Sequence, residues 1–405
     1  MLINEATRDF IRRHADDDVR RLALQGTKSG EVDLMQALQQ IAGRQTARRK
    51  LPSWAEVDDI VYPPHLNMEQ CSSEQTARYK AQIVNCKLSN CKLSNGKSFV
   101  DLTGGFGVDF YWMSKGFESR AYVEQDAELC AIAEANFRLL GLSCSVSCAN
   151  SAAYLTEMEH ADVIFLDPAR RNEHGGRTYS IEDCSPNVME LLPLLLEKAD
   201  MIVLKLSPML DWRKAVSDLK HVAEVHIVSV DNECKELLLV LGKEATGDLR
   251  LVCVNNSQIL AFSPSLRTPS PKATDSEFVG YGPERPSYLY EPNASIMKAG
   301  CFDELAARFP VSQVAANSHL FLSTDEIEDF PGRGFQISAI SSMNKKEIGE
   351  KLSGVKSANI AVRNFPMTAD QLRKKLKLKD GGPVYIFATT AQDGSHELYI
   401  CRKIG

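Results

Sequence analysis

The sequence has no long apolar run and no paired cysteine motif. No stretch approaches the roughly 18 apolar residues of a membrane span, and the first residues, Met1 to His14, are charged, unlike a signal peptide. Its 11 cysteines include no C-x-x-C pair, and their odd number suits reduced thiols better than disulfides or a zinc site. These absences predict a cytoplasmic protein with no metal site and no membrane partner.

The chain also lacks an excess of basic residues. Its formal net charge is −6 at pH 7, which argues against indiscriminate binding to polyanions, and no DNA partner is expected. The length of 405 residues corresponds to two to four domains, and a hydrophobic content of 44% permits sizeable cores.

The most informative stretch begins at Val100 and reads VDLTGGFGVD. An apolar run ends in a carboxylate, Asp101, and a turn that contains Gly104, Gly105 and Gly107 then opens a short helix. Glycines let a backbone approach a ligand closely, and the free N–H groups of a helix N-terminus favour an anionic ligand group. The pattern predicts a nucleotide-like cofactor at this turn. The alternative is a tight turn in an ordinary α/β protein.

Strands and helices alternate beyond this turn. The second strand, 119–124, ends in Glu124, which lies 17 residues after Gly107, near the spacing at which an acid meets a ribose hydroxyl in doubly wound folds. Asp126 caps a predicted helix, and further strands are predicted at 144–148, 162–167 and 201–206.

The last two predicted strands, 226–230 and 237–241, are separated by only six residues. Because a parallel crossover needs a dozen or more residues, this pair must be antiparallel. The predicted fold class is therefore α/β, a doubly wound sheet of seven strands that ends in an antiparallel hairpin.

This order of elements resembles that of class I S-adenosylmethionine-dependent methyltransferases over residues 97–242. The resemblance implies S-adenosyl-L-methionine as the cofactor. By position, Gly105 and Gly107 line its methionine portion, Asp101 lies near its amino group, and Glu124 bonds its ribose. Gly104 replaces another small residue that is common in the family.

Two further positions concern the adenine end of the cofactor. Asn150, followed by Ser151, stands where the family often has an aspartate that accepts from the adenine amino group; the alternative is an ordinary loop residue. A nicotinamide or flavin enzyme is the competing interpretation, but its fingerprint needs a small third residue where this chain has Phe110.

The segment Asp167-Pro168-Ala169-Arg170 follows the fourth predicted strand and resembles the family's fourth motif. Enzymes that methylate base amines often have a second proline and an aromatic residue there, and this chain has neither. We expect Asp167 to orient the nucleophile and accept its proton, and Arg170 to hold an anionic or carbonyl group of the substrate. The alternative for Asp167 is a helix cap. Lys205 is either a substrate contact or a lysine leaving the sheet edge.

Residues 1–85 are predicted to form an N-terminal helical domain, followed by the methyltransferase domain at 86–245. Ser72 and Gln75 form a capping box. The helix before the first strand covers the cofactor in many methyltransferases, so that Ser73, Thr76 and Lys80 are candidates for its carboxylate, with plain packing as the alternative. The pentapeptide CKLSN at 86–90 recurs at 91–95 and is interpreted as a loop insertion.

Two small α+β domains are predicted after residue 245. The first, 246–335, includes a hairpin at 249–262, six prolines from Pro264 to Pro292, and a helix at 296–309. The second, 336–405, resembles a THUMP-like module of the kind appended to RNA-modifying enzymes. Residues 343–380 carry ten Lys or Arg against four Asp or Glu, which suits either phosphate contacts or a solvated helix face.

The segments EQCSSE (69–74) and DLTGGFG (101–107) resemble a bacterial family of class I methyltransferases with a small ferredoxin-like domain and a C-terminal THUMP-like domain. The resemblance implies an RNA methyltransferase that acts on tRNA or rRNA. Two alternatives stay open. One is a small-molecule or protein methyltransferase, and the other is a catalytically inactive RNA-binding protein.

Overall fold

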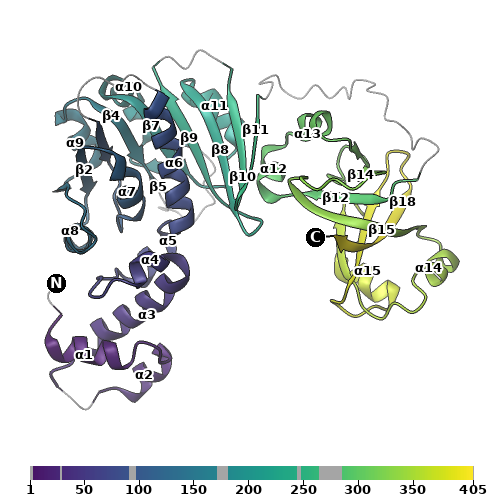
Figure 1. The fold of residues 1–405 in the computed structure, drawn as a ribbon, viewed down its shortest axis with the longest axis horizontal. Coiled ribbons are helices and arrows are strands. Elements are labelled where there is room, and N and C mark those ends of the chain that lie inside the picture. Colours follow the sequence, from purple (N-terminus) through teal and green to yellow (C-terminus); the bar gives the residue numbers. More distant parts are fainter. Residues whose placement is uncertain are drawn as a thin grey trace. The chain divides into compact units, whose positions relative to one another are not determined.

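The computed structural model describes residues 3–27, 30–90, 97–170, 181–243, 248–263 and 285–404. The chain divides into two compact units (Figure 1), of which the first comprises Met1–Ala223 and Leu238–Gly247 and the second comprises Glu224–Leu237 and Asp248–Gly405. The second copy of the pentapeptide and most of the proline-rich stretch lie outside the described residues.

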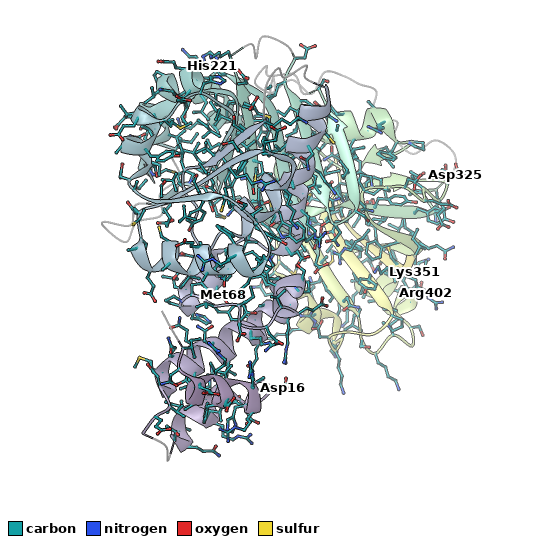
Figure 2. All side chains as sticks on the ribbon, turned by 60° about the vertical axis from the view of Figure 1, so that its left-hand side comes forward. Asp16, Met68, His221, Asp325, Lys351 and Arg402 are labelled. Carbon is teal, nitrogen blue, oxygen red and sulfur yellow. The ribbon has the colours of Figure 1, made fainter. Side chains whose placement is uncertain are left out.

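The N-terminal part of the first unit is helical, as the sequence predicts. Asn4, Asp18 and Asp33 each cap a helix with a side-chain oxygen that accepts a backbone N–H group. Met68 is buried, whereas Asp16 projects from a loop (Figure 2). The helices are α1 (Glu5–Arg13), α2 (Val19–Gln25), α3 (Leu34–Lys50), α4 (Pro52–Ala55), α5 (His65–Gln70) and α6 (Glu74–Asn90).

A mixed, largely parallel sheet with helices between its strands follows, which confirms the predicted fold class. Its strands are β1 (Ser98–Asp101), β2 (Ser119–Glu124), β3 (Ser145–Cys148), β4 (Ala161–Leu166), β7 (Ala199–Leu206), β8 (Val222–Val230), β9 (Glu233–Gly242), β10 (Arg250–Asn255) and β11 (Gln258–Phe262). The intervening helices are α7 (Val108–Met113), α8 (Ala127–Leu139), α9 (Ser151–Glu157), α10 (Val188–Lys198) and α11 (Trp212–Leu219).

The strand order is β11-β10-β8-β9-β7-β4-β1-β2-β3. In the centre, β1 pairs in parallel with both β2 and β4, so that the carboxyl ends of these strands lie at one edge. Only Asp231 and Asn232 connect β8 to β9, and their positive φ angles of 51° and 61° suit the tight turn of the predicted antiparallel hairpin.

The sheet has nine strands rather than the predicted seven. The hairpin at 249–262 forms as expected, but β10 pairs in parallel with β8, from Arg250↔Glu224 to Asn255↔Ser229. The apolar residues of β10 are buried in this arrangement, and the pairing satisfies backbone groups that β8 would otherwise leave open at the sheet edge.

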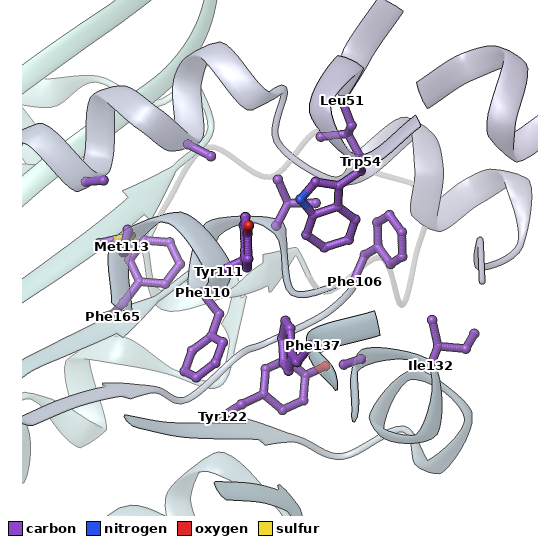
Figure 3. Close-up of a cluster of buried hydrophobic side chains, with 14 of the residues drawn as sticks. Leu51, Trp54, Phe106, Phe110, Tyr111, Met113, Tyr122, Ile132, Phe137 and Phe165 are labelled. Carbon is purple, nitrogen blue, oxygen red and sulfur yellow. The ribbon is translucent and has the colours of Figure 1, made fainter. Parts of the chain in front are cut away.

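Aromatic side chains fill the core directly behind the glycine turn (Figure 3). Phe106 from the turn itself packs edge-on against Trp54 of α4 at a ring-centroid distance of 5.1 Å. Tyr122 of β2 and Phe137 of α8 lie beneath it, with centroids 5.4 Å apart. The turn therefore rests on a rigid base contributed by helices before and after it.

The second unit contains a seven-stranded sheet of order β13-β14-β12-β15-β18-β17-β16. Its strands are β12 (Tyr288–Pro292), β13 (Ser312–Gln313), β14 (Phe321–Ser323), β15 (Gly332–Ser342), β16 (Asn359–Arg363), β17 (Val384–Thr390) and β18 (His396–Ile404). Its helices are α12 (Ala294–Ala299), α13 (Phe302–Arg308), α14 (Lys345–Lys351) and α15 (Ala369–Leu376).

The helix predicted at 296–309 is two helices, because Gly300 adopts the left-handed conformation (φ 67°) and ends α12. The predicted capping box of Thr368 and Gln371 is present at α15. Within the parts of the chain that the structure describes, no helix combines the length and apolar character that crossing a bilayer requires.

Candidate active site

The glycine turn joins β1 to α7 at the carboxyl edge of the sheet. A Cβ atom at Gly104 would lie 2.1 Å from the ring of Tyr122, so that only glycine fits against this base. At Gly105 (φ 53°) a Cβ would meet only the carbonyl oxygen of Thr103, at 3.9 Å. The turn is therefore packed tightly on its inner side and has space at Gly105, as a backbone that receives a ligand requires.

Asp101 lies under the turn and is almost completely buried. Its Oδ1 atom accepts from the Thr103 N–H at 2.9 Å, but its Oδ2 atom is buried and has no hydrogen-bond partner among the residues that the structure describes. Burial, reinforced by the carboxylates of Asp109, Asp167 and Glu124, raises the pKa of Asp101 well above its usual value. An unpartnered buried carboxylate oxygen is a ready acceptor for a cationic donor.

Glu124 is held in place at the end of β2. Its Oε2 atom accepts from the Gly105 N–H at 2.8 Å, and its Oε1 atom accepts from the N–H groups of Gln125 and Asp126 at 2.8 and 3.0 Å. A carboxylate has about four lone-pair sites, so that these bonds orient the group and leave capacity for hydroxyl donors. Asp126 caps α8 as predicted.

The two residues predicted at the adenine end have roles in the fold. The side-chain oxygen of Asn150 accepts from the N–H groups of Ala152 and Ala153 and caps α9. Ser151 donates from Oγ to the Leu102 carbonyl at 2.6 Å, which ties the start of α9 to the end of β1. The structure places both residues next to the turn, with these side-chain oxygens used within the protein.

The structure places the side-chain cap of α6 on Ser73, one residue after the predicted Ser72. Ser73, rather than Ser72, accepts from the Thr76 N–H, at 3.2 Å, and the buried Thr76 hydroxyl donates back to the Ser73 carbonyl. Ser72 instead donates from Oγ to Asp109 Oδ2 at 2.7 Å. The local signal was ambiguous because the two serines are adjacent, and a partner distant in the sequence decided between them.

A chain of alternating charges runs from α6 to the end of β4. Lys80, fully buried, lies 3.1 Å from Asp109 Oδ1, and Lys205 lies 3.7 Å from Asp109 Oδ2. The Nζ atom of Lys205 also donates to Asp167 Oδ2 at 2.5 Å. Although burial raises the pKa of Asp109, the two lysines outweigh it, and the pKa lies below its usual value.

Asp109 was missed as a functional candidate. The signal available in the sequence was a carboxylate two residues after the last glycine of the turn, a position that also suits the first turn of a helix. Asp109 joins Lys80 and Lys205 through ion pairs. For Lys80 the sequence allowed a cofactor contact or plain packing, and for Lys205 a substrate contact or an exposed lysine.

Asp167 is the most accessible member of this row of charged side chains, with 38% of its side chain exposed. Its backbone N–H donates to the Thr103 hydroxyl at 2.6 Å. It does not cap a helix, because Ala169–Arg170 form a short strand, β5, that pairs with β6 (Cys184–Ser185). The side chain of Arg170 lies outside the described residues.

These features fit the cofactor that the sequence resemblance implies. S-adenosyl-L-methionine carries an ammonium, a carboxylate, a positively charged sulfur and two ribose hydroxyls. The unpartnered oxygen of Asp101 suits the ammonium, the space at Gly105 suits a chain passing over the turn, and the fixed carboxylate of Glu124 suits the hydroxyls. The fold, and the arrangement of these residues at its carboxyl edge, are those expected of a class I methyltransferase.

Comparisons with known proteins agree with this class. A THUMP domain-like family model matches residues 332–403, and a ferredoxin-like domain model matches residues 288–331. An uncharacterized S-adenosylmethionine-dependent methyltransferase of Mycobacterium tuberculosis, found in strains CDC 1551 and H37Rv, is 24% identical over 340 residues, which cover 83% of this chain and 87% of that protein.

A crystal structure of a protein described as a methyltransferase, from Porphyromonas gingivalis W83, covers 100% of both chains at 29% identity with a TM-score of 0.83. This chain is therefore an S-adenosylmethionine-dependent methyltransferase, and its C-terminal part matches the ferredoxin-like and THUMP-like domain models. Its cofactor is S-adenosyl-L-methionine.

Proposed function

We propose that this methyltransferase modifies RNA, either tRNA or rRNA, in the cytoplasm. The observation that carries the proposal is the THUMP-like match at residues 332–403, because such modules are appended to RNA-modifying enzymes. The local charge supports it, since residues 343–380 carry ten Lys or Arg against four Asp or Glu in a chain whose net charge is −6.

The basic groups of this segment are available to a partner. Lys374, Lys375 and Lys377 at the end of α15 are exposed. Lys351 is exposed as well, and so is Arg402 on β18, outside the segment (Figure 2). Arg373 differs, because it is held by ion pairs with Asp370 and Asp380. Exposed lysines that are not paired in this way suit contacts with phosphates, which position a nucleic acid without reading its bases.

In the proposed site, the residues predicted from the sequence hold the cofactor. Asp101 accepts from the amino group, Gly104, Gly105 and Gly107 form the turn under the methionine portion, and Glu124 bonds the ribose. Asn150 and Ser151 border the adenine, and Thr76 lies at the start of the helix that covers the cofactor carboxylate. The bound cofactor supplies a methyl group on a positively charged sulfur.

Asp167 and Lys205 act on the methyl acceptor. A carboxylate and an ammonium side by side, 2.5 Å apart, present an acceptor and a donor toward the accessible end of the charge chain. We propose that Asp167 orients the nucleophile and takes its proton, and that Arg170 holds an anionic or carbonyl group of the substrate. Because positioning supplies much of the acceleration of methyl transfer, the main requirement is that the methyl acceptor is held in a fixed place.

Nucleoside analysis of RNA tests this proposal. RNA from a strain lacking the gene is digested and compared with wild-type RNA by mass spectrometry, and the purified protein then restores methylation in vitro. One methylated nucleoside should be missing from the deletion strain and return on incubation with the wild-type protein. Identical nucleoside profiles in the two strains would exclude RNA as the substrate.

A further inference from the structure

A cavity lies among the N-terminal helices of the first unit. It has a volume of about 210 Å³ and is bordered by α1, α3, the loop at 57–62 and one residue of α8. Arg8, Arg12, Arg44 and Tyr62 are among the residues that line it, and the glycine turn, Glu124 and Asp167 are not. The cavity is therefore separate from the candidate active site.

The loop that forms one wall is held from both sides. The Gln40 side-chain amide accepts from the Tyr62 N–H and donates to the Tyr62 carbonyl, both at 2.8 Å. Asn136 makes the same pair of bonds with Val61, both at 2.9 Å. Because both amides are buried, breaking these bonds would leave unpaired polar groups, and the wall is preformed.

Two residues of the lining each carry a buried donor for which the described part of the chain offers no partner. Arg44 donates from Nη2 to Asp58 at 3.2 Å, whereas its Nε atom is buried and no described residue bonds to it. The Tyr62 hydroxyl is likewise buried without a partner. Burial raises the pKa of Tyr62 to about 12, so that the hydroxyl keeps its proton at neutral pH. Buried donors of this kind call for an acceptor.

The remaining arginines are only loosely paired. Arg8 and Arg12 share the carboxylate of Asp59 at 3.5 and 4.0 Å, and Arg12 also lies 3.9 Å from Asp9. Arg8 Nη2 also donates a long hydrogen bond to the Ile3 carbonyl, at 3.4 Å. These separations exceed the roughly 2.7–3.2 Å of a direct N–H···O bond. Both guanidinium groups therefore keep donors for another anion, and their planar geometry matches a phosphate.

The rest of the lining includes apolar side chains, among them Ile11, Val57 and Ile60. The volume is smaller than the roughly 300–1,000 Å³ of pockets that enclose drug-sized ligands, so that one small unit fits. We propose that this cavity binds a single nucleotide, with its phosphate on Arg8 and Arg12 and its base against the apolar wall. The nucleotide is either free or one unit of an RNA chain, and only the second case rests on the proposed function.

Calorimetric titration of the full-length protein with uridine and adenosine monophosphates tests the site. Saturating S-adenosylhomocysteine keeps the nucleotides out of the cofactor pocket. The double variant R8Q/R12Q should weaken binding at least tenfold. Arg13 lies on the same helix but not at the cavity, and R13Q should leave the affinity within twofold. Absence of binding, or equal losses in both variants, would overturn the proposal.

Competition distinguishes the two sources of the nucleotide. A single-stranded oligoribonucleotide that displaces the monophosphate from the wild-type protein, and does so less well from R8Q/R12Q, identifies RNA as the ligand. Failure to displace it identifies a free nucleotide. Neither measurement needs methyl transfer, so that a protein with no activity on RNA could still bind a nucleotide here.

Discussion

Three carboxylates near the glycine turn have different surroundings. Asp101 is buried with one oxygen unpartnered, and Asp109 is buried between two lysines. Asp167 has 38% of its side chain exposed and pairs with Lys205. The buried, unpartnered oxygen of Asp101 suits a cationic ligand, and the buried ion pairs of Asp109 suit a structural role. The partial exposure of Asp167 suits contact with a substrate.

Replacement of Asp167 by alanine should abolish turnover and leave the affinity for the cofactor within a few-fold. In the proposed mechanism the Asp167 carboxylate contacts the methyl acceptor rather than the cofactor, so that only the reaction step loses its positioning. Methyl transfer to RNA and calorimetry with S-adenosylhomocysteine measure the two quantities. D200A is a matched control at an exposed carboxylate beside His160. Retained turnover in D167A would remove this residue from the mechanism.

Replacement of Asp101 by asparagine should separate stability from binding. The raised pKa means that the folded state holds the Asp101 proton more tightly than the unfolded state does. The stability that this residue contributes is therefore present at low pH and is lost as pH rises through its raised pKa. The amide of D101N cannot ionise, so the free-energy cost of a buried charged carboxylate at pH 7.5 disappears. Without cofactor, the variant should be more stable than the wild type by about 1 kcal/mol or more and should melt a few degrees higher.

The same variant should bind the cofactor at least tenfold more weakly, since a neutral amide replaces the acceptor of the amino group. Thermal unfolding between pH 5 and 8 should show the gain of D101N shrinking toward pH 5. A variant that melts lower than the wild type at every pH would contradict this account of the buried carboxyl group.

The sequence could predict the residues of the turn but not all of their partners. The glycines and the acids that end β1 and β2 follow from local spacing. The ion pairs of Asp109 with Lys80 and Lys205 join residues that lie far apart in the chain, and periodicity carries no information about them. For Asn150 the sequence leaves two interpretations, an adenine contact or an ordinary loop residue. In the structure its side-chain oxygen caps α9, a role that local sequence can indicate.

At the scale of elements, local signals predicted most boundaries. The two-residue connection between β8 and β9 and the capping box at α15 match their sequence patterns. Two features differ from the sequence predictions, the first through a local glycine signal and the second through tertiary pairing. Gly300 divides one predicted helix because its left-handed conformation ends α12, and β10 extends the large sheet because the edge of β8 is available to it. The second depends on tertiary pairing and could not be derived from hydropathy.

The cap of α6 offers a test of this element. Replacing Ser73 by alanine should destabilise the protein by about 1 kcal/mol, because the Thr76 N–H loses its acceptor. S73T keeps a hydroxyl and should cost much less. S72A should cost about 1.5–3 kcal/mol, since a hydrogen bond to a charged carboxylate is lost. Urea unfolding midpoints rank the stabilities of the three variants. If S73A is as stable as the wild type, Ser73 is not the cap of α6 and Ser72 is.

At the scale of the whole molecule, the candidate active site lies in the first unit, whereas the basic segment lies in the second. A net charge of −6 means that attraction to RNA must come from a local surface rather than from the average charge of the chain. We propose that the second unit contacts RNA phosphates and the first unit binds the cofactor. Phosphate contacts can then be weakened in the second unit without any change in cofactor binding.

The double variant K374Q/K375Q should reduce RNA affinity and make it less sensitive to salt. Each lost phosphate contact lowers the slope of log Kd against log salt concentration by about 0.7–0.9, so that two contacts lower it by between one and two. K220Q/K243Q removes the same charge from exposed lysines of the first unit and should leave the slope unchanged. Affinity for S-adenosylhomocysteine should be equal in all proteins. If both variants change the slope equally, binding is a response to net charge, and the THUMP-like part has no special role in holding RNA.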